Sequence, residues 1–203
     1  MPLRRRSVSH IGLGCLLSLA ACSSVNPAGL GMVSRLDPLN TPPQEITFAV
    51  GVPDTVRLTD EDAVFHIALL DTGTGTIPLV EARVPLDLSR ASPGEPLSPS
   101  ESEVVYLARI APSNAARIAR AQSDIKAMRA QGIQGRGSLG VTLVGGCLLD
   151  PQLTALPVST WIQSNPDQGF VALTRQTDLF EVLDPEDAER LRAQLGPCGG
   201  PES

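Results

Sequence analysis

The stretch that decides the fold is residues 63–86, which read AVFHIALLDTGTGTIPLVEARVPL. Residues 63–70 and 76–86 are apolar and rich in β-branched side chains, which is typical of core strands. Residues 71–75 between them include two glycines and predict a turn. The stretch therefore predicts a β-hairpin. Two prolines in its second arm predict an edge strand, because proline cannot donate a ladder hydrogen bond.

Short strand-like segments recur on both sides of this hairpin. Turn residues separate them at intervals of roughly 8 to 12 residues, which is typical of an antiparallel sandwich. Residues 157–163 and 170–174 flank such a turn and predict a second hairpin. The other strands are expected at residues 46–50, 56–58, 104–108 and 138–149.

The longest helical pattern covers residues 113–131. Its apolar side chains recur at spacings of three and four residues and therefore share one face. Ser113 is expected to cap this helix and Gly132 to end it. We interpret the apolar face as packing on a sheet, with a partner-binding helix as the alternative. The face consists of Ile118, Ala121, Ile125 and Met128.

A second helix is predicted over residues 185–195. Asp184 precedes Pro185 in the order expected at a helix start, and the acidic residues that follow complement the helix dipole. Together these elements predict an α+β domain, mainly an antiparallel β-sandwich with two helices. An immunoglobulin-like arrangement is compatible with the pattern.

The chain divides into four parts. Residues 1–21 have the features of a signal peptide, and residues 22–44 contain four prolines and two glycines without periodicity, which predicts an extended tether. A single domain is expected over residues 45–198. Residues 199–203 form a short tail.

The signal segment ends in a specific motif. Three arginines at residues 4–6 precede an uncharged, mainly apolar run, which is shorter than the roughly 20 residues of a membrane-spanning helix. The run ends in Leu19-Ala20-Ala21-Cys22, which resembles the lipobox of bacterial lipoproteins. The resemblance implies cleavage between Ala21 and Cys22, a diacylglyceryl group on the Cys22 sulfur and a fatty acyl chain such as palmitate on the new amino terminus. The alternative is an ordinary secretory signal with an incidental cysteine.

The resemblance also implies a cellular location. A lipoprotein of this kind is anchored in the bacterial cell envelope and faces the periplasm. Ser23 follows the anchor where an aspartate often retains enterobacterial lipoproteins in the inner membrane, so we favour the outer membrane.

Charge and composition limit the partners. Residues 1–21 hold three of the 16 basic residues and none of the 22 acidic ones, so the remainder has a formal charge of −9. No long basic run remains, which argues against nucleic acid and anionic lipid surfaces as partners. The chain has only six aromatic residues, which argues against stacking platforms for sugars or single-stranded nucleic acid.

Two cysteines, Cys147 and Cys198, remain after the anchor. Outside the cytoplasm such a pair is expected to form a disulfide. A metal pair or a redox pair is the alternative, but the spacing is not CxxC, and His66 is the only histidine after residue 10. We therefore expect a structural disulfide, no metal site and no cofactor.

One stretch suggests catalysis. Leu69-Leu70-Asp71-Thr72-Gly73-Thr74 resembles the active-site turn of retroviral-type aspartic proteases, which implies that Asp71 would share a proton with its counterpart in a second subunit and activate water. The family's later apolar-Gly-Arg element has no match, because residues 133–136 read IQGR.

A serine triad would need His66, which lies in an expected core strand, and the sequence has no GxSxG elbow for the serine. The clustered carboxylates at residues 60–62 and 184–187 are interpreted as caps.

The leading interpretation is a lipid-anchored, non-enzymatic lipoprotein. Its domain would act through an envelope protein partner as an interaction or assembly component. An aspartic-type peptidase using Asp71 and a small-ligand or lipid carrier are the alternatives. The carrier requires a roomy apolar cavity.

Overall fold

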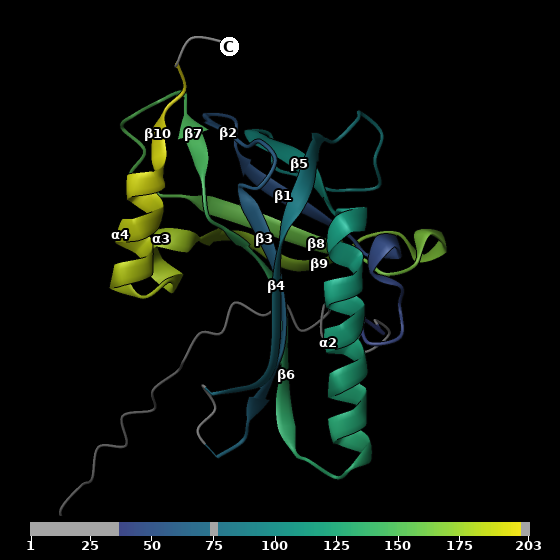
Figure 1. Cartoon of the computed structure of the whole chain (residues 1–203). Helices are drawn as coiled ribbons and strands as arrows, with labels where there is room; N and C mark the ends of the chain where they lie inside the picture. Colours follow the sequence, from purple (N-terminus) through teal and green to yellow (C-terminus); the bar gives the residue numbers. More distant parts are fainter. Residues whose placement is uncertain (1–36, 74–76, 200–203) are drawn as a thin grey trace, which may run out of the picture.

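The computed structural model describes residues 37–73 and 77–199, and its main feature is a seven-stranded antiparallel sheet (Figure 1). The spatial order of the strands is β6-β3-β4-β5-β1-β8-β9. The α+β class with a mainly antiparallel β architecture is confirmed. In chain order these strands are β1 (Thr47–Pro53), β3 (Ala63–Asp71), β4 (Pro78–Arg90), β5 (Glu103–Ile110), β6 (Gly135–Leu143), β8 (Pro157–Gln163) and β9 (Val171–Asp178).

A small second sheet and several helices complete the fold. The small sheet has the order β10-β7-β2, in which β10 and β7 are parallel. Its strands are β2 (Val56–Arg57), β7 (Gly146–Leu148) and β10 (Leu195–Pro197). The helices are η1 (Pro43–Glu45), α2 (Pro112–Ala130), η2 (Pro166–Gln168), α3 (Leu179–Val182) and α4 (Pro185–Gln194).

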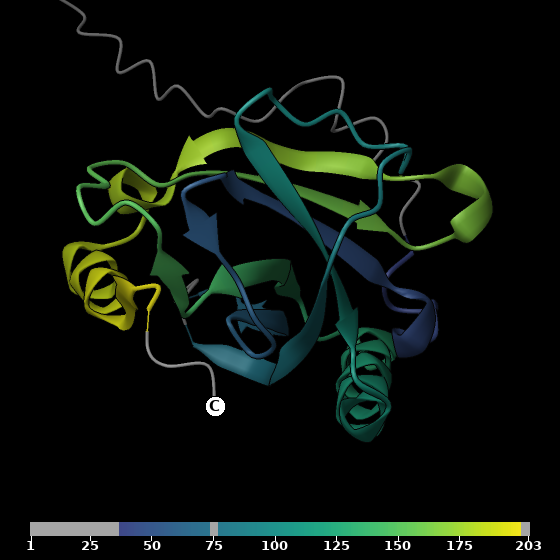
Figure 2. The same ribbon diagram turned by 90° about the horizontal axis from the view of Figure 1, so that it is seen from above.

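Strand β4 folds the large sheet over. Residues 78–85 pair with β3, as the hairpin prediction requires, whereas residues 86–90 pair with β5. The two layers of the predicted sandwich are therefore halves of one curled sheet, not the two separate sheets of an immunoglobulin-like arrangement (Figure 2). The prediction that β4 is an edge strand is wrong for the strand as a whole. Pro78 and Pro85 both lie in residues 78–85 of β4, which pair with β3 on one side and with no strand on the other. A proline is tolerated there because no ladder hydrogen bond from its nitrogen is needed.

The core lies between the concave side of this sheet and α2. Alternate residues of β3 point inward, and Phe65 contacts Phe48 of β1 with 5.1 Å between the ring centroids. The predicted apolar face of α2 is confirmed, since Ile118 and Ile125 are fully buried. This packing joins the two halves of the sheet.

The ends of α2 differ in how well they were predicted. The N-cap is Ala111, which makes no side-chain capping bond, so the assignment of Ser113 as the cap is wrong. Pro112 occupies the first turn instead, where its missing N–H is tolerated and its φ suits the helix. The end at Gly132 is confirmed: this glycine has φ 80°, and the Ile133 N–H donates to the Met128 carbonyl at 3.0 Å.

The strand predicted at residues 138–149 is two strands. β6 begins earlier, at Gly135, and ends at Leu143, and the chain then turns into β7. The break is at Val144 and Gly145, where the Val144 N–H donates to the Asp62 carbonyl. Gly146 has φ 138°, which a residue with a side chain rarely adopts. β7 thereby leaves the large sheet and pairs with β2 and β10.

The C-terminal elements are tied to β7. The disulfide between Cys147 and Cys198 is confirmed, with 4.9 Å between the Cα atoms. Asp184 caps α4 as predicted, because its side chain accepts a hydrogen bond from the Asp187 N–H. The short helix α3 was not predicted.

Residues 37–45, expected to belong to the tether and the domain start, contact α2. The buried Gln122 side chain donates to the carbonyls of Pro38 and Thr41, at 2.6 and 2.9 Å. Leu39 packs against the core, and Pro43 is buried in η1. The signal peptide, Cys22 and most of the tether lie outside the described residues. Within the described ranges, no helix is both long and apolar enough to cross a membrane.

Candidate functional site

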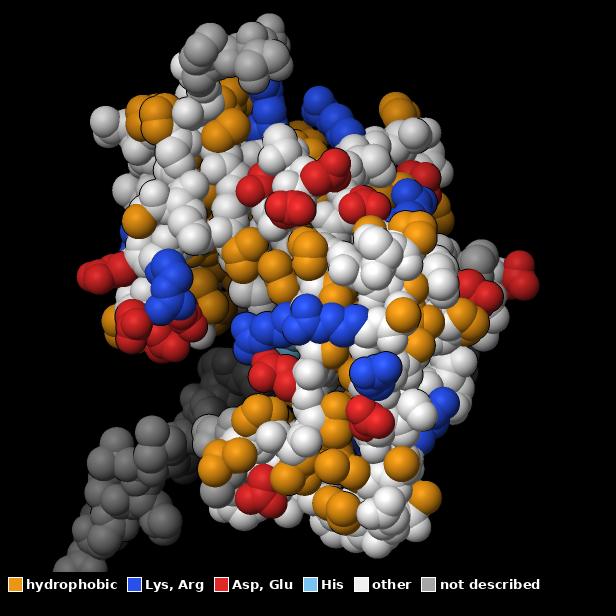
Figure 3. All heavy atoms as spheres, viewed as in Figure 1, with side chains coloured by type: hydrophobic (Ala, Val, Ile, Leu, Met, Phe, Trp, Pro, Cys, Tyr) orange, Lys and Arg blue, Asp and Glu red, His pale blue; other side chains and the backbone are white. Residues whose placement is uncertain are grey.

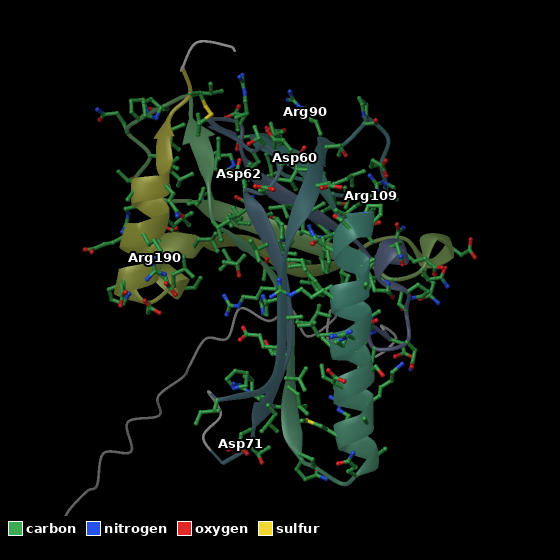
Figure 4. All side chains as sticks on the ribbon, in the orientation of Figure 1. Asp60, Asp62, Asp71, Arg90, Arg109 and Arg190 are labelled. Carbon is green, nitrogen blue, oxygen red and sulfur yellow. A yellow bond between two sulfur atoms is a disulfide. The ribbon has the colours of Figure 1, made fainter. Side chains whose placement is uncertain are left out.

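Asp71, the candidate protease residue, lies at the end of β3, at the lower tip of the domain (Figure 4). It faces Gly135 of β6 in the strand register, and its N–H donates to the Ile77 carbonyl. The other labelled aspartates, Asp60 and Asp62, lie near the opposite end of the molecule. The protease-like arrangement would pair Asp71 with its counterpart in a second copy of the chain.

His66, the candidate triad residue, is half-buried on β3 between β4 and β6. Its Nε2 lies 3.4 Å from the Ser138 hydroxyl, and Gly140 leaves room for the ring. Burial lowers the pKa of the imidazole below its ordinary value, Arg83 opposite lowers the pKa further, and Glu81 raises it. No carboxylate in the described part of the chain hydrogen-bonds to this ring, so the orienting acid of a triad is missing there.

The lowered pKa of His66 predicts a pH-dependent stability. Below about pH 6.5 the unfolded chain takes up a proton more readily than the folded one, so stability falls as the pH drops from about 7 to 5. The His66→Gln variant should lose less stability over this range than the wild type. Thermal unfolding at several pH values measures the difference. Equal pH dependence in both proteins would contradict the assignment.

Asp62 caps a turn, as the sequence suggested, because a carboxylate oxygen accepts from the Thr59 N–H at 2.7 Å. Asp60 instead makes a contact to β4, where its carboxylate accepts from the Leu88 N–H at 2.7 Å. Asp184 caps the start of α4. In residues 37–73 and 77–199, no three His, Cys, Asp or Glu side chains gather as metal ligands would.

The feature best suited to binding is a cavity of about 420 Å³ between β6 and β9, the two edge strands of the large sheet. We call the line along which these two strands face each other without pairing the seam. Ligand pockets in proteins range from about 300 to 1,000 Å³ and are mostly apolar. The aliphatic wall comes from four strands, α2 and the segment before η1. It consists of Leu39, Ile67, Ile125, Leu139, Ile162 and Leu173.

A second chamber of about 230 Å³ continues along the same seam. Leu139 of β6 and Leu173 of β9 line both chambers. The further wall includes Val50 and Val158. The hydroxyls of Thr160 and Thr174, also in this wall, hydrogen-bond to each other at 2.8 Å. The two chambers are therefore adjacent along the seam, and both are largely apolar.

Two charged side chains border the larger chamber. Arg129, in the last turn of α2, extends toward β6, and its Nη2 would lie 3.2 Å from a Cβ at Gly137. Asp37 borders the chamber from the N-terminal side, and its carboxylate accepts from the Asn40 amide at 2.8 Å. The site thus combines an aliphatic wall with polar groups at its border.

A third hollow, of about 370 Å³, lies under the loop between β4 and β5. This loop, predicted as a long surface loop, packs through Ala91 and Leu97 against a small cluster around Trp161 on the other side of the sheet. One Glu103 carboxylate oxygen accepts from the Ser100 N–H at 2.9 Å. The other is buried and has no hydrogen-bond partner among the described protein atoms.

Comparison of the chain with models of protein families, with curated proteins and with solved structures finds no match. The cavity is therefore interpreted from its own geometry. Sequence reasoning did not identify any of its residues as a site. The only signal was the apolar face of α2, which includes Ile125, because the remaining wall residues are ordinary strand residues.

Proposed function

We propose that this chain is a lipid-anchored envelope lipoprotein whose domain binds and carries a small apolar ligand. The observation that carries the proposal is the two-chambered cavity at the seam between β6 and β9. The edge strands β6 and β9 do not pair with each other, so apolar side chains on their inner faces stay accessible from the seam. A ligand seated there would remove this surface from water, which is favourable by about 25 cal/mol per Å².

The proposed anchor supports this function by its position. Asp37 and Leu39 border the cavity, and Asp37 lies only 15 positions after Cys22. A fully extended chain of that length spans about 50 Å. An anchored domain would therefore keep its cavity near the membrane, which is a source of apolar molecules.

Ligand binding can be tested with a neutral phenylnaphthylamine dye, whose fluorescence rises in apolar sites. We expect saturable binding to the wild type and strongly reduced binding to Leu139→Trp and Leu173→Trp, because indole rings would fill the seam. Both leucines are half-buried, so the larger side chain can be accommodated. The control is Leu149→Trp, since Leu149 is 52% exposed and borders neither chamber. No dye binding, or equal loss in the control, would refute the proposal.

The anchor itself predicts a second result. Cys22→Ala removes the sulfur that would carry the lipid, so the protein should shift from the membrane fraction to the soluble fraction or remain uncleaved. Fractionation and the mass of the amino terminus measure both effects. A processed, membrane-bound variant would contradict the lipid anchor. Cys22→Ser is a matched control for size and polarity, and we expect it to behave as Cys22→Ala does.

A partner-binding role is a second candidate, favoured by the surface at the lower end of the domain. Hydrophobic side chains gather there, below a band of Lys and Arg side chains (Figure 3). Ile77, Leu79 and Ile133 belong to this end and are 58%, 36% and 37% exposed. In-cell crosslinking of the anchored protein would test this role. A reproducible envelope partner crosslinked at these residues would support it, and crosslinks spread over the whole surface would not.

A further inference from the structure

We propose that the natural ligand of this cavity is a single-chain amphiphile with an anionic head group, which Arg129 binds at the border of the larger chamber. The inference rests on the proposed function and adds the chemistry and the orientation of the ligand. The aliphatic chain would lie along the seam between β6 and β9. The head group would remain near the C-terminal end of α2.

The first step of the argument is the state of Arg129. Among the described residues, Arg83 forms an ion pair with Glu81, and Arg190 forms ion pairs with Glu186 and Asp187. Arg129 takes part in none of these pairs, and its side chain is exposed beside the aliphatic wall. A guanidinium beside an apolar cavity is well suited to a carboxylate or phosphate, which it can bind through two parallel hydrogen bonds.

The second step concerns the negative charge at the same border. The Asp37 carboxylate accepts from Asn40, and the Asp37 carbonyl accepts from the Thr41 hydroxyl at 2.8 Å. Asp37 is therefore part of the turn that holds the N-terminal segment on α2. No ion pair joins it to Arg129 within the described ranges, which leaves Arg129 as the group at this border suited to an outside anion.

The third step is the approach of Arg129 to β6. Gly137 lies in β6 at the position where a side chain would meet the guanidinium. Because this residue has no Cβ, the arginine can lie across the strand beside Leu139, which lines both chambers. The head-group site and the aliphatic wall are thus adjacent.

The fourth step is the shape of the apolar part. Leu139 and Leu173 line both chambers, so the two chambers adjoin at these side chains. Among the residues that the structure describes, no aromatic side chain lines either chamber. A flexible alkyl chain suits this aliphatic wall better than a planar ring with polar substituents.

The test compares ligands that share one chain and differ in head group. Dodecanoate, dodecanol and dodecyltrimethylammonium, each below its micelle concentration, would compete with the neutral dye for the full-length protein. We expect dodecanoate to bind about tenfold more tightly than dodecanol, as a charge-assisted contact at a partly exposed site would give. Arg129→Gln should abolish this preference, because it should weaken dodecanoate binding about tenfold more than it weakens dodecanol binding.

Arg120→Gln is the matched control. Arg120 is an exposed arginine of α2 and borders neither chamber, so its removal should preserve the preference. A preference for dodecanoate that survives in Arg129→Gln would overturn the inference, and so would tightest binding of dodecyltrimethylammonium. Equal binding of all three ligands would overturn the inference and leave the proposed function intact. Absence of both dye and dodecyl binding would refute the proposed function itself.

Discussion

The Cys147→Ala, Cys198→Ala double variant is expected to lose roughly 4 kcal/mol of stability, because the crosslink closes a loop of 51 residues in the unfolded chain. For a domain of this size the loss corresponds to a fall in Tm of about 10 °C. Thermal unfolding with and without reductant measures it. Reductant should lower the Tm of the wild type and leave that of the double variant unchanged.

The structure also indicates which part of the domain would open first without the disulfide. The disulfide joins β7 to the residue after β10, and β10 follows directly from α4. The three-stranded sheet has few residues, so without the crosslink α4 and β10 should open more often than the large sheet. Hydrogen exchange should become faster around Leu191 and Leu195 than around Phe65. Unchanged Tm and unchanged exchange would show that the bridge contributes little.

The Phe65→Ala variant should lose about 3 to 5 kcal/mol, which is the usual cost of removing a buried phenylalanine. Phe65 is fully buried on β3, and its ring contacts Phe48 on β1. These strands belong to the two halves of the curled sheet, so the contact connects the halves across the core. The cavity left behind would weaken both halves.

Denaturant unfolding at constant slope measures the stability change. Phe180→Ala is the matched control, because Phe180 is only partly buried and Arg192 covers its ring at 4.0 Å. The control should lose much less stability than Phe65→Ala. A loss below about 1 kcal/mol for Phe65→Ala would mean that the core does not join the halves as described.

Several parts of the fold were predictable because their signals are local. The hairpin of residues 63–86, the apolar face of α2 and the Asp184 cap each depend on residues a few positions apart. The pairing of Cys147 with Cys198 was predictable for a different reason: only two cysteines remained after Cys22. The first three features follow from side-chain patterns over a few neighbouring residues, and the disulfide follows from the number of cysteines left to pair.

Other parts depended on contacts that the sequence does not display. The second arm of the hairpin continues past Pro85, where it leaves β3 and pairs with β5. Its prolines therefore mark only the part of β4 that has one neighbouring strand, not a whole edge strand. The break between β6 and β7 depends on the Asp62 carbonyl, which lies far away in the sequence. Gln122 is a polar residue of α2, yet its side chain is buried and donates to the carbonyls of Pro38 and Thr41.

By itself, the sequence determined the types of the main elements, the disulfide partners and the lipobox-like motif at Cys22, since these depend on local pattern or on the residue inventory. Only the tertiary structure decided the cavity. Its aliphatic wall combines residues from Leu39 to Leu173, which lie on four strands, on α2 and in the segment before η1. These residues become neighbours only because the sheet curls at β4 and brings β6 and β9 close together without pairing them to each other. Each wall residue alone is an ordinary aliphatic residue. A binding site made of such residues exists only as a spatial arrangement, because shape and the exclusion of water, not any one side chain, create its affinity.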